Sequence, residues 1–413
     1  MKLRLLGIIA LTTCLVAGII AAHPFGKADT SGSWNSATNA VPGRPKPISA
    51  NSWDPKAAAA YLDQREVQWM EWSTAARDHD TFCVSCHTVL PYALSRPVLR
   101  RALGNRTVSV NERKLLDNIS KRVRIWNEVG PFYTDHDDGR YKATQSRGTE
   151  SVLNALILAT YDAQNGELSD DTKAAFRNMW TLQEIQGSGK GAWSWLQFGL
   201  EPWESRDSQY YGATLAAIAI GSAPGKYGSS PEIQTNVKLL REYLGSGYRN
   251  QTLANRILLL SASAKLPGLI NSEQQKSIID ECLSKQQADG GWSLFPLART
   301  WRDWSLSSLF GAWKRPDGTP QELKSDGYAT GLITLTLQQV GIRSDNLHVS
   351  RGLTWLEHNQ AKPDGSWPGY SLNRRRNPSS MTGRFMTDAA TAYAVLALTE
   401  ANSHNEKSAY SSK

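Results

Sequence analysis

The sequence predicts an all-α protein in which apolar helices form an inner ring and amphipathic helices form an outer ring. Two observations indicate this fold class. Apolar residues recur at three- and four-residue intervals along most of the chain, whereas the alternation typical of strands is scarce. Helices that are apolar almost all round alternate with helices that have one apolar stripe and a charged face, as buried and surface helices do.

Six helices are expected in each ring. The inner helices cover, in chain order, residues 88–104, 146–160, 207–221, 251–264, 325–339 and 387–400. The outer helices follow them at 110–129, 170–184, 231–244, 272–287 and 346–360, and the early segment 54–75 supplies the last one. This order predicts that the two ends of the folded part meet and close the ring.

A short link repeats after several of the outer helices. It reads QEIQGSGKGAWSW at 183–195, QQADGGWSL at 286–294 and QAKPDGSWPGY at 360–370. Glycine turns the chain after the helix, Asp can accept from free N–H groups of the turn, and Trp packs back over the helix end. Trp193 and Trp292 are also candidates for lining a cavity, although packing is the commoner role of such residues.

These Q-x-x-D-G-x-W links resemble the repeats of the squalene-hopene cyclase and protein prenyltransferase superfamily, over roughly residues 145–413. The resemblance implies an (α/α)6 toroid whose reactive centre lies at the mouth, where the inner helices begin. Four acidic residues near those starts are therefore candidates for the rim: Glu150, Asp207, Asp326 and Asp388. Capping of helix N-termini explains the three aspartates without catalysis.

The N-terminus has the features of an export signal. Lys2 and Arg4 precede the apolar run LLGIIALTTCLVAGIIAA, and small residues lie near possible cuts after Ala22 or Ala28. A run of about 18 residues also suits an uncleaved membrane anchor. We therefore expect a signal peptide or anchor over 1–28, a polar linker over 29–50, and a protein that is periplasmic or anchored at the outer side of the inner membrane.

Cys83, Cys86 and His87 form a C-x-x-C-H pentad at the start of an expected inner helix. This spacing suits one covalent haem c, because the thiols meet the two vinyl groups and the adjacent imidazole binds the iron. A zinc site is one alternative, with a carboxylate or His79 as the fourth ligand. A redox disulfide between the two cysteines, or a chance occurrence of the spacing, is the other. Residues 51–130 are thus expected to form a haem-attachment segment, and 131–413 the toroid repeats.

The second axial ligand of such a haem is less clearly indicated. His79 and His136 are candidates by proximity in the sequence, and Met70 is a third. Both histidines lie in polar segments, where solvated loop histidines are commoner than ligands. An open position that binds a small ligand such as oxygen or peroxide is the alternative.

A D-x-D-D cluster protonates the alkene in squalene-hopene cyclases, and DHDD at 135–138 resembles it, with Asp137 and Asp138 as candidate catalytic residues. The polar run GRYKATQSRG follows, which favours a charged surface loop instead. In prenyltransferases an Asp-x-Cys holds zinc at the start of an inner helix. Tyr328 stands where that thiol would be, which disfavours zinc-dependent prenyl transfer.

The function classes that remain differ in their chemistry. The formal charge of +8 is spread along the chain without a basic stripe interleaved with aromatics, so nucleic acid is not an expected partner. The first prediction is an exported haem protein for electron transfer or haem-based redox chemistry, with a redox partner protein and a small apolar, isoprenoid-like substrate. The alternatives are a divergent terpene cyclase or polysaccharide lyase without redox role, and a binding module in which haem is structural.

Overall fold

The computed structural model describes residues 53–133, 139–299 and 313–411. Ala50–Lys413 form one compact unit, so the segment that carries the C-x-x-C-H pentad folds together with the repeats. The expected signal or anchor and the polar linker lie outside the described residues. Within the described ranges, no helix combines the length and the apolar character that crossing a bilayer requires.

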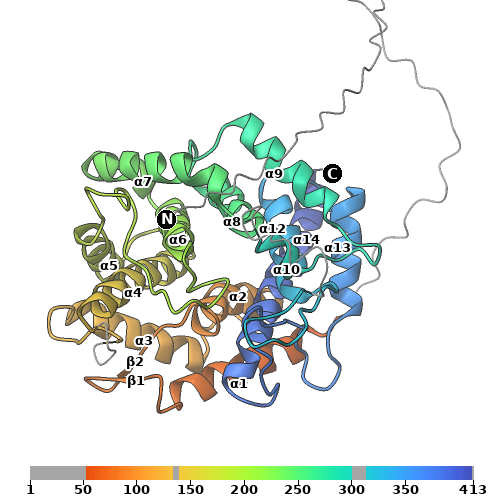
Figure 1. Cartoon of the computed structure of the whole chain (residues 1–413), viewed down its shortest axis with the longest axis horizontal. Coiled ribbons are helices and arrows are strands. Elements are labelled where there is room, and N and C mark those ends of the chain that lie inside the picture. The colour runs from red at the N-terminus through yellow and green to blue at the C-terminus, as the bar shows by residue number, and fades with distance from the viewer. Residues whose placement is uncertain (1–52, 134–138, 300–312, 412–413) are drawn as a thin grey trace, which may run out of the picture. The chain divides into compact units, whose positions relative to one another are not determined.

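Six helices of the described chain form a closed inner ring (Figure 1). They are α2 (Val89–Ala102), α4 (Gly139–Asp162), α6 (Ser208–Ser222), α8 (Leu253–Lys265), α12 (Gly327–Gln339) and α14 (Phe385–Ser411). Each packs against the next, and α14 packs against α2, which closes the ring. The helices α6 and α12 are buried on nearly every face, as their sequences predict.

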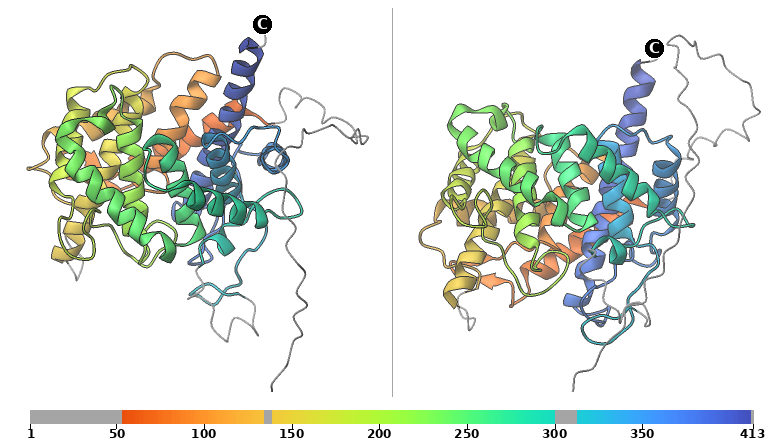
Figure 2. Two further views of the ribbon diagram at one scale, coloured as in Figure 1. Left: turned by 90° about the horizontal axis from the view of Figure 1, so that it is seen from above. Right: turned by 45° about the horizontal axis from the view of Figure 1, so that its top comes forward.

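Six outer helices pack around this ring: α1 (Pro55–Met70), α3 (Val110–Arg124), α5 (Asp170–Thr181), α7 (Gln234–Gly247), α9 (Ser272–Ser284) and α13 (Leu347–His358). The early helix α1 contacts both α2 and α14, which is the place expected for the last outer helix. Figure 2 shows the ring from two other sides, with α14 projecting beyond it at its C-terminal end. The all-α toroid is confirmed at this level of description.

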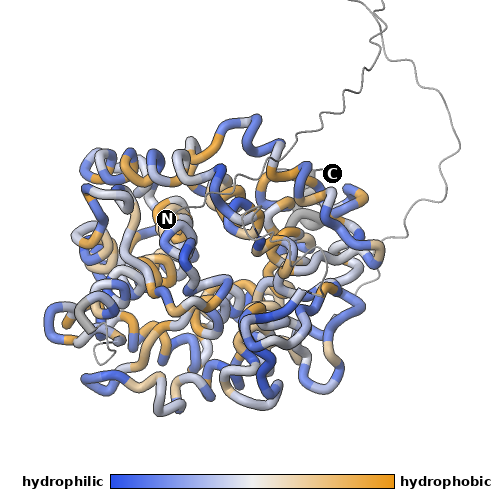
Figure 3. The backbone as a smooth tube through the Cα atoms, in the orientation of Figure 1, coloured by the Kyte–Doolittle hydropathy of each residue, from blue (hydrophilic) through white to orange (hydrophobic). Residues whose placement is uncertain are grey.

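The remaining described elements are short. They are the antiparallel strands β1 (Ala76–Arg77) and β2 (Thr81–Phe82), the helix α10 (Leu294–Leu297), and the 3-10 turns η1 (Tyr227–Ser229), η2 (Pro231–Ile233), η3 (Tyr248–Asn250) and η5 (Thr382–Arg384). Apolar residues concentrate along the inner helices and on the inward sides of the outer ones (Figure 3). Because each outer helix returns the chain, the inner helices begin at one end of the ring, which we call the mouth.

The Trp of each repeated link closes the last turn of the outer helix before it. Its indole N–H donates to a backbone carbonyl of that turn in three links: Trp193 to Met179, Trp292 to Cys282 and Trp367 to Leu356, at 2.6, 2.8 and 2.7 Å. Each of these carbonyls also accepts from the backbone N–H just beyond its helix, so the indole adds a second donor at the helix end. Trp193 and Trp292 are fully buried, so they pack the fold and do not line an open cavity.

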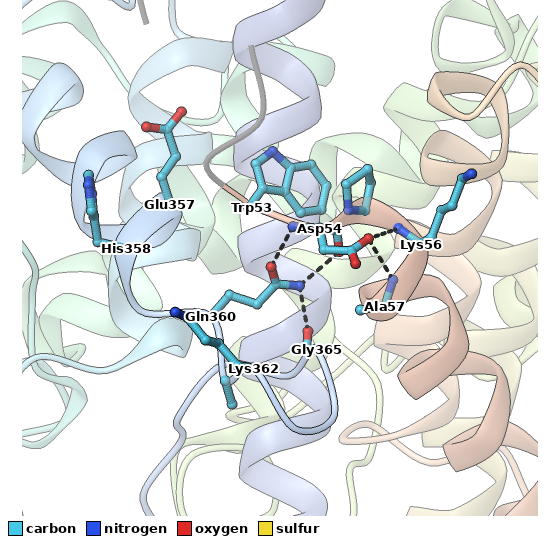
Figure 4. A pocket seen from close by; sticks show the side chains of 11 residues that line it. Trp53, Asp54, Lys56, Ala57, Glu357, His358, Gln360, Lys362 and Gly365 are labelled. Carbon is cyan, nitrogen blue, oxygen red and sulfur yellow. Dashed lines mark hydrogen bonds between the residues drawn. The ribbon is translucent and has the colours of Figure 1, made fainter. Parts of the chain in front are cut away.

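The Gln of each link joins two neighbouring outer helices. Its side-chain amide donates both to a glycine carbonyl of its own link and to a carbonyl near the start of the next outer helix: Gln183 to Gly191 and Asn236, Gln286 to Gly290 and His348, Gln360 to Gly365 and Asp54. The last of these joins α13 to α1. Figure 4 shows Gln360 in that junction, beside a 760 Å³ pocket.

Candidate active site

The C-x-x-C-H pentad lies directly before α2, at the mouth, where the sequence places it. Cys83 and Cys86 are only 4% and 3% exposed. Burial raises the pKa of the Cys83 thiol to about 11 and that of Cys86 well above its ordinary value. Both sulfurs are therefore protonated thiols at neutral pH, which are poor nucleophiles and poor metal ligands.

The His87 ring is enclosed by aromatic rings. It stacks on Phe385, the first residue of α14, with 3.6 Å between centroids and 17° between planes. Trp69 meets it edge-on at 5.3 Å, and Trp203 is tilted against it at 5.8 Å. A porphyrin on the imidazole would have to displace these rings.

The arrangement therefore does not fit the cofactors that the spacing suggests. No group of three or more His, Cys, Asp or Glu side chains in the described ranges converges as a metal site, so the alternative zinc site at Cys83, Cys86 and His87 is not formed. The prediction of a haem-based redox protein is corrected by this packing. Covalent haem attachment stays a prediction from the spacing alone, and it requires the loop to open.

Two of the candidate distal ligands lie in the described residues. Met70 ends α1, and His79 is exposed in the turn between β1 and β2, with a left-handed φ of 53°. His136, Asp137 and Asp138 lie outside the described residues. The cyclase-like acidic cluster thus stays a prediction.

Three of the four acidic rim candidates are buried in structural hydrogen bonds or ion pairs. Asp388 accepts from Arg65, and Glu150 accepts from Arg122 at 2.5 Å, both in buried ion pairs. Asp326 caps α12 and accepts from the backbone N–H groups of Ala329 and Leu294. Its burial raises its pKa to about 7.

Asp207 differs from these three because it is exposed just before α6. The sequence therefore predicts that acidic residues lie near the starts of the inner helices. It does not indicate which of these carboxylates form ion pairs or cap a helix.

A hydrogen-bonded chain fixes the tautomer of His87. The Thr88 hydroxyl donates to Asp388 at 2.7 Å, so it must accept from His87 Nδ1, 3.1 Å away. The imidazole proton is thereby assigned to Nδ1, and Nε2 carries the lone pair. Burial, followed by the charges of Arg65 and Arg376, lowers the pKa of His87 to about 3, so the ring is neutral. No described residue bonds Nε2.

Glu204 is the residue that sequence reasoning missed. It lies in the connection between a repeated link and α6, where its backbone pairs with Leu200 in an isolated β-bridge. Its side chain is half-buried, and no hydrogen bond or ion pair to the carboxyl group is found among the described residues. Burial raises its pKa to about 7, against the opposing charge of Lys142. The neighbouring aromatics in WSWLQFGLEPWE are the only sequence signal.

Glu204 lies near the C-x-x-C-H loop. Trp203, which precedes Glu204, contacts the His87 ring, and the Glu204 charge contributes to the raised pKa of Cys86, which precedes His87. Aromatic contacts continue from His87 through Trp203. Trp203 meets Tyr328 at 5.8 Å, and Tyr328 meets Tyr393 at 5.1 Å, both edge-to-face.

The mouth thus combines a carboxylic acid, a neutral imidazole with an open nitrogen, and aromatic surfaces. A carboxyl group with a pKa near 7 can donate a proton at neutral pH and take one back, which is the requirement for general acid–base catalysis. Apolar walls with a few polar groups are typical of small-molecule and substrate sites. The chemistry available here is proton transfer.

Comparisons with known proteins add little to this site. No family model matches the chain, and no curated protein matches it. A solved structure of a glycosidase variant matches 84% of this chain and 97% of its own, with a TM-score of 0.47 and 9% sequence identity. The resemblance to the cyclase and prenyltransferase superfamily therefore stands only in its coarse form, a helical toroid.

Proposed function

We propose that this protein is a non-redox enzyme that cleaves an acidic polysaccharide by β-elimination, with Glu204 as general acid. The observation that carries the proposal is the state of Glu204. Its carboxyl group is unpaired among the described residues, keeps solvent-accessible surface, and has a pKa of about 7. Within the described ranges Glu66 also lacks a hydrogen-bonding partner, but it is fully buried, so Glu204 differs from it in being accessible to a substrate.

The proposed reaction uses both polar groups of the site. Nε2 of His87 takes the proton on the carbon next to the sugar carboxylate. A ring with a pKa of about 3 is a weak base, so this step requires the negative charge of the bound substrate to raise the pKa of His87. The electrons of that C–H bond form a C=C bond as the C–O bond to the next sugar breaks, and Glu204 gives its proton to the departing oxygen. Solvent then removes the proton from His87 and returns one to Glu204, so the enzyme is restored without an oxidant or reductant.

Arg376 is the proposed partner of the substrate carboxylate. Arg376 is half-buried and donates a long hydrogen bond of 3.4 Å to the Thr382 hydroxyl. Its positive charge contributes to the lowered pKa of His87. An arginine fork suits a planar carboxylate, and neutralising that carboxylate makes the adjacent carbon more acidic. The aromatic rings of Trp203 and Phe385 offer flat apolar surfaces for sugar rings.

A divergent terpene cyclase is the second candidate, and the aromatic rings around Tyr328 favour it, because such rings stabilise carbocations. Protonating an alkene requires a strong acid, however. A carboxylic acid with a pKa of about 7 is a weak one. Its candidate substrate would be a small isoprenoid-like polyene, and turnover of a polyene by the purified protein would favour this function over ours.

The location of the enzyme is proposed from its N-terminal sequence. The basic residues followed by an apolar run support export, either to the periplasm or as a protein anchored at the outer side of the inner membrane. A polymeric substrate is compatible with either place, because large polysaccharides do not enter the cytoplasm intact.

The test is a screen of acidic polysaccharides for cleavage. Elimination creates a C=C bond conjugated to the carboxylate, and its ultraviolet absorbance rises with each bond broken. We expect the purified full chain to produce this signal on at least one polyuronate, Glu204→Gln to lose it, and the exposed control Glu242→Gln to keep it. A signal of equal size from Glu204→Gln and the unmodified protein would refute the proposal.

A further inference from the structure

Two neighbouring hollows on the surface share a lining residue, and one of them includes residues that directly precede Glu204 in the chain. One has a volume of 410 Å³ and includes Glu201 and Pro202, which directly precede Trp203 and Glu204. The other, of 460 Å³, reaches the end of α9. Both hollows include Asn250, and they meet at the adjacent residues Ala298 and Arg299. We call the two hollows together the α8 groove, because they include the start of α8.

The charges along the α8 groove leave an excess of cations. Two arginines are paired, Arg299 with Glu201 at 3.2 Å and Arg256 with Glu281 at 2.8 Å. The other charged residues that line it are three exposed cations and one carboxylate: Arg206, Arg249, Lys285 and Asp207. The N-terminal end of α8 lies at the groove and adds partial positive charge there, because the first N–H groups of a helix are not bonded within it.

The floor of the α8 groove is apolar. Phe295 and Leu253 are buried beneath it, and Leu323 remains 52% exposed at its far end. A cationic rim over an apolar floor suits a ligand with charged edges and apolar faces. A chain of uronic acid sugars has this character, because carboxylates project from its edges while ring C–H groups form its faces.

We propose that the α8 groove binds several sugars of an acidic polysaccharide on one side of Glu204, so that the enzyme cuts within the chain. This inference rests on the function proposed above and adds the path of the substrate. The length of the groove predicts that affinity increases with the number of sugars. Its charge predicts that a carboxylated chain binds better than a neutral chain of equal length, and that added salt weakens the binding.

Binding is measured by calorimetry with the Glu204→Gln form of the full chain, so that the ligand is not cleaved. The ligands are dimers and hexamers of galacturonate, mannuronate and guluronate, and a neutral hexasaccharide. The test variant adds Arg249→Gln and Lys285→Gln. The matched control adds Arg113→Gln and Lys114→Gln, which remove the same two charges from the exposed side of α3.

We expect a uronate hexamer to bind more tightly than the dimer, and the groove variant to lose about tenfold in affinity, as removal of two rim charges would give. The α3 control should bind as before. Equal affinities of the groove variant and the α3 control, or equal binding of the neutral and the uronate hexamers, would overturn the proposed binding in the α8 groove. Neither result bears on the proposed cleavage, which the absorbance test measures. Binding through the groove without any cleavage by the unmodified protein would instead overturn the proposed function.

Discussion

At the scale of single residues, the chemistry of this protein depends on side chains whose ordinary properties are changed by their surroundings. Burial raises the pKa of Glu204, and the charge of Lys142 opposes this shift. His87 is held in one tautomer by Thr88. Both effects come from residues that are distant in the sequence, so neither is visible in a local motif.

The pH dependence of activity follows from Glu204. The group must carry its proton to act as an acid, and its pKa in the folded protein is about 7. We therefore expect kcat/KM to fall as the pH rises through about 7, and a profile measured between pH 5 and 9 checks this. A rate that is flat across that range would contradict the role of Glu204.

Glu204 also affects stability, with a sign that can be worked out. Its pKa is raised on folding from 4.5 to about 7, so its contribution is fully present below pH 4.5 and is lost as the pH rises through 7. We expect Glu204→Gln to stabilise the protein at pH 8 by about 1–2 kcal/mol, after allowing for its partial exposure. Urea unfolding at pH 4 and pH 8 measures the difference. A destabilised variant at pH 8 would contradict the raised pKa.

Thr88 is a positioning residue, since it acts through His87. We expect Thr88→Val to lower kcat by about tenfold to a hundredfold with little change in KM, because Nδ1 loses its acceptor and the other tautomer becomes accessible. Thr88→Ser keeps the hydroxyl and should restore the rate. Nitrogen NMR shifts of His87 report the tautomer directly, and an unchanged tautomer in Thr88→Val would contradict this role.

At the scale of elements, the repeated links explain how twelve helices form one ring in the described chain. The Trp completes the outer helix before it, and the Gln ties that helix to the next. The signature therefore has a structural task at each position, and its presence says little about chemistry. Gln360 performs that task where the early helix α1 completes the outer ring.

Removing this glutamine should loosen one junction of the ring. We expect Gln360→Ala to destabilise the protein by about 2 kcal/mol, because the Gly365 carbonyl and the Asp54 N–H lose their partner and the Asp54 carbonyl keeps only its bond from Ala58. Hydrogen exchange should increase in α1 and α13. In the matched variant Gln183→Ala the increase should appear in α5 and α7 instead. Uniform changes over the whole chain in both variants would contradict a local role.

The spacing of the C-x-x-C-H loop predicts haem attachment, whereas its packing leaves no room for a porphyrin on His87. The thiols are buried and protonated, and His87 stacks on Phe385. The spacing predicts that protein produced together with a haem-ligation system gains the mass of one haem, whereas the loop as packed here would leave the mass of the polypeptide alone. Intact mass spectrometry decides between the two. A gain of one haem that disappears in Cys83→Ala/Cys86→Ala would show that this loop opens during maturation.

At the scale of the whole molecule, the ring could be predicted from the sequence, and the site could not. The six inner and six outer helices follow from apolar periodicity, and the place of α1 follows from counting them. The pKa of Glu204 is raised by burial within the folded chain, and Phe385 and Trp203, from distant parts of the sequence, enclose His87. The C-x-x-C-H spacing suggested haem because spacing carries no information about burial.

The most direct test of the central claim is the ultraviolet absorbance produced when the full chain is mixed with acidic polysaccharides, followed for the unmodified protein, Glu204→Gln and Glu242→Gln. The account predicts new C=C bonds from the unmodified protein and from Glu242→Gln, and a loss of at least about a hundredfold in Glu204→Gln. Equal rates in all three proteins, or cleavage that requires an added oxidant, would contradict it.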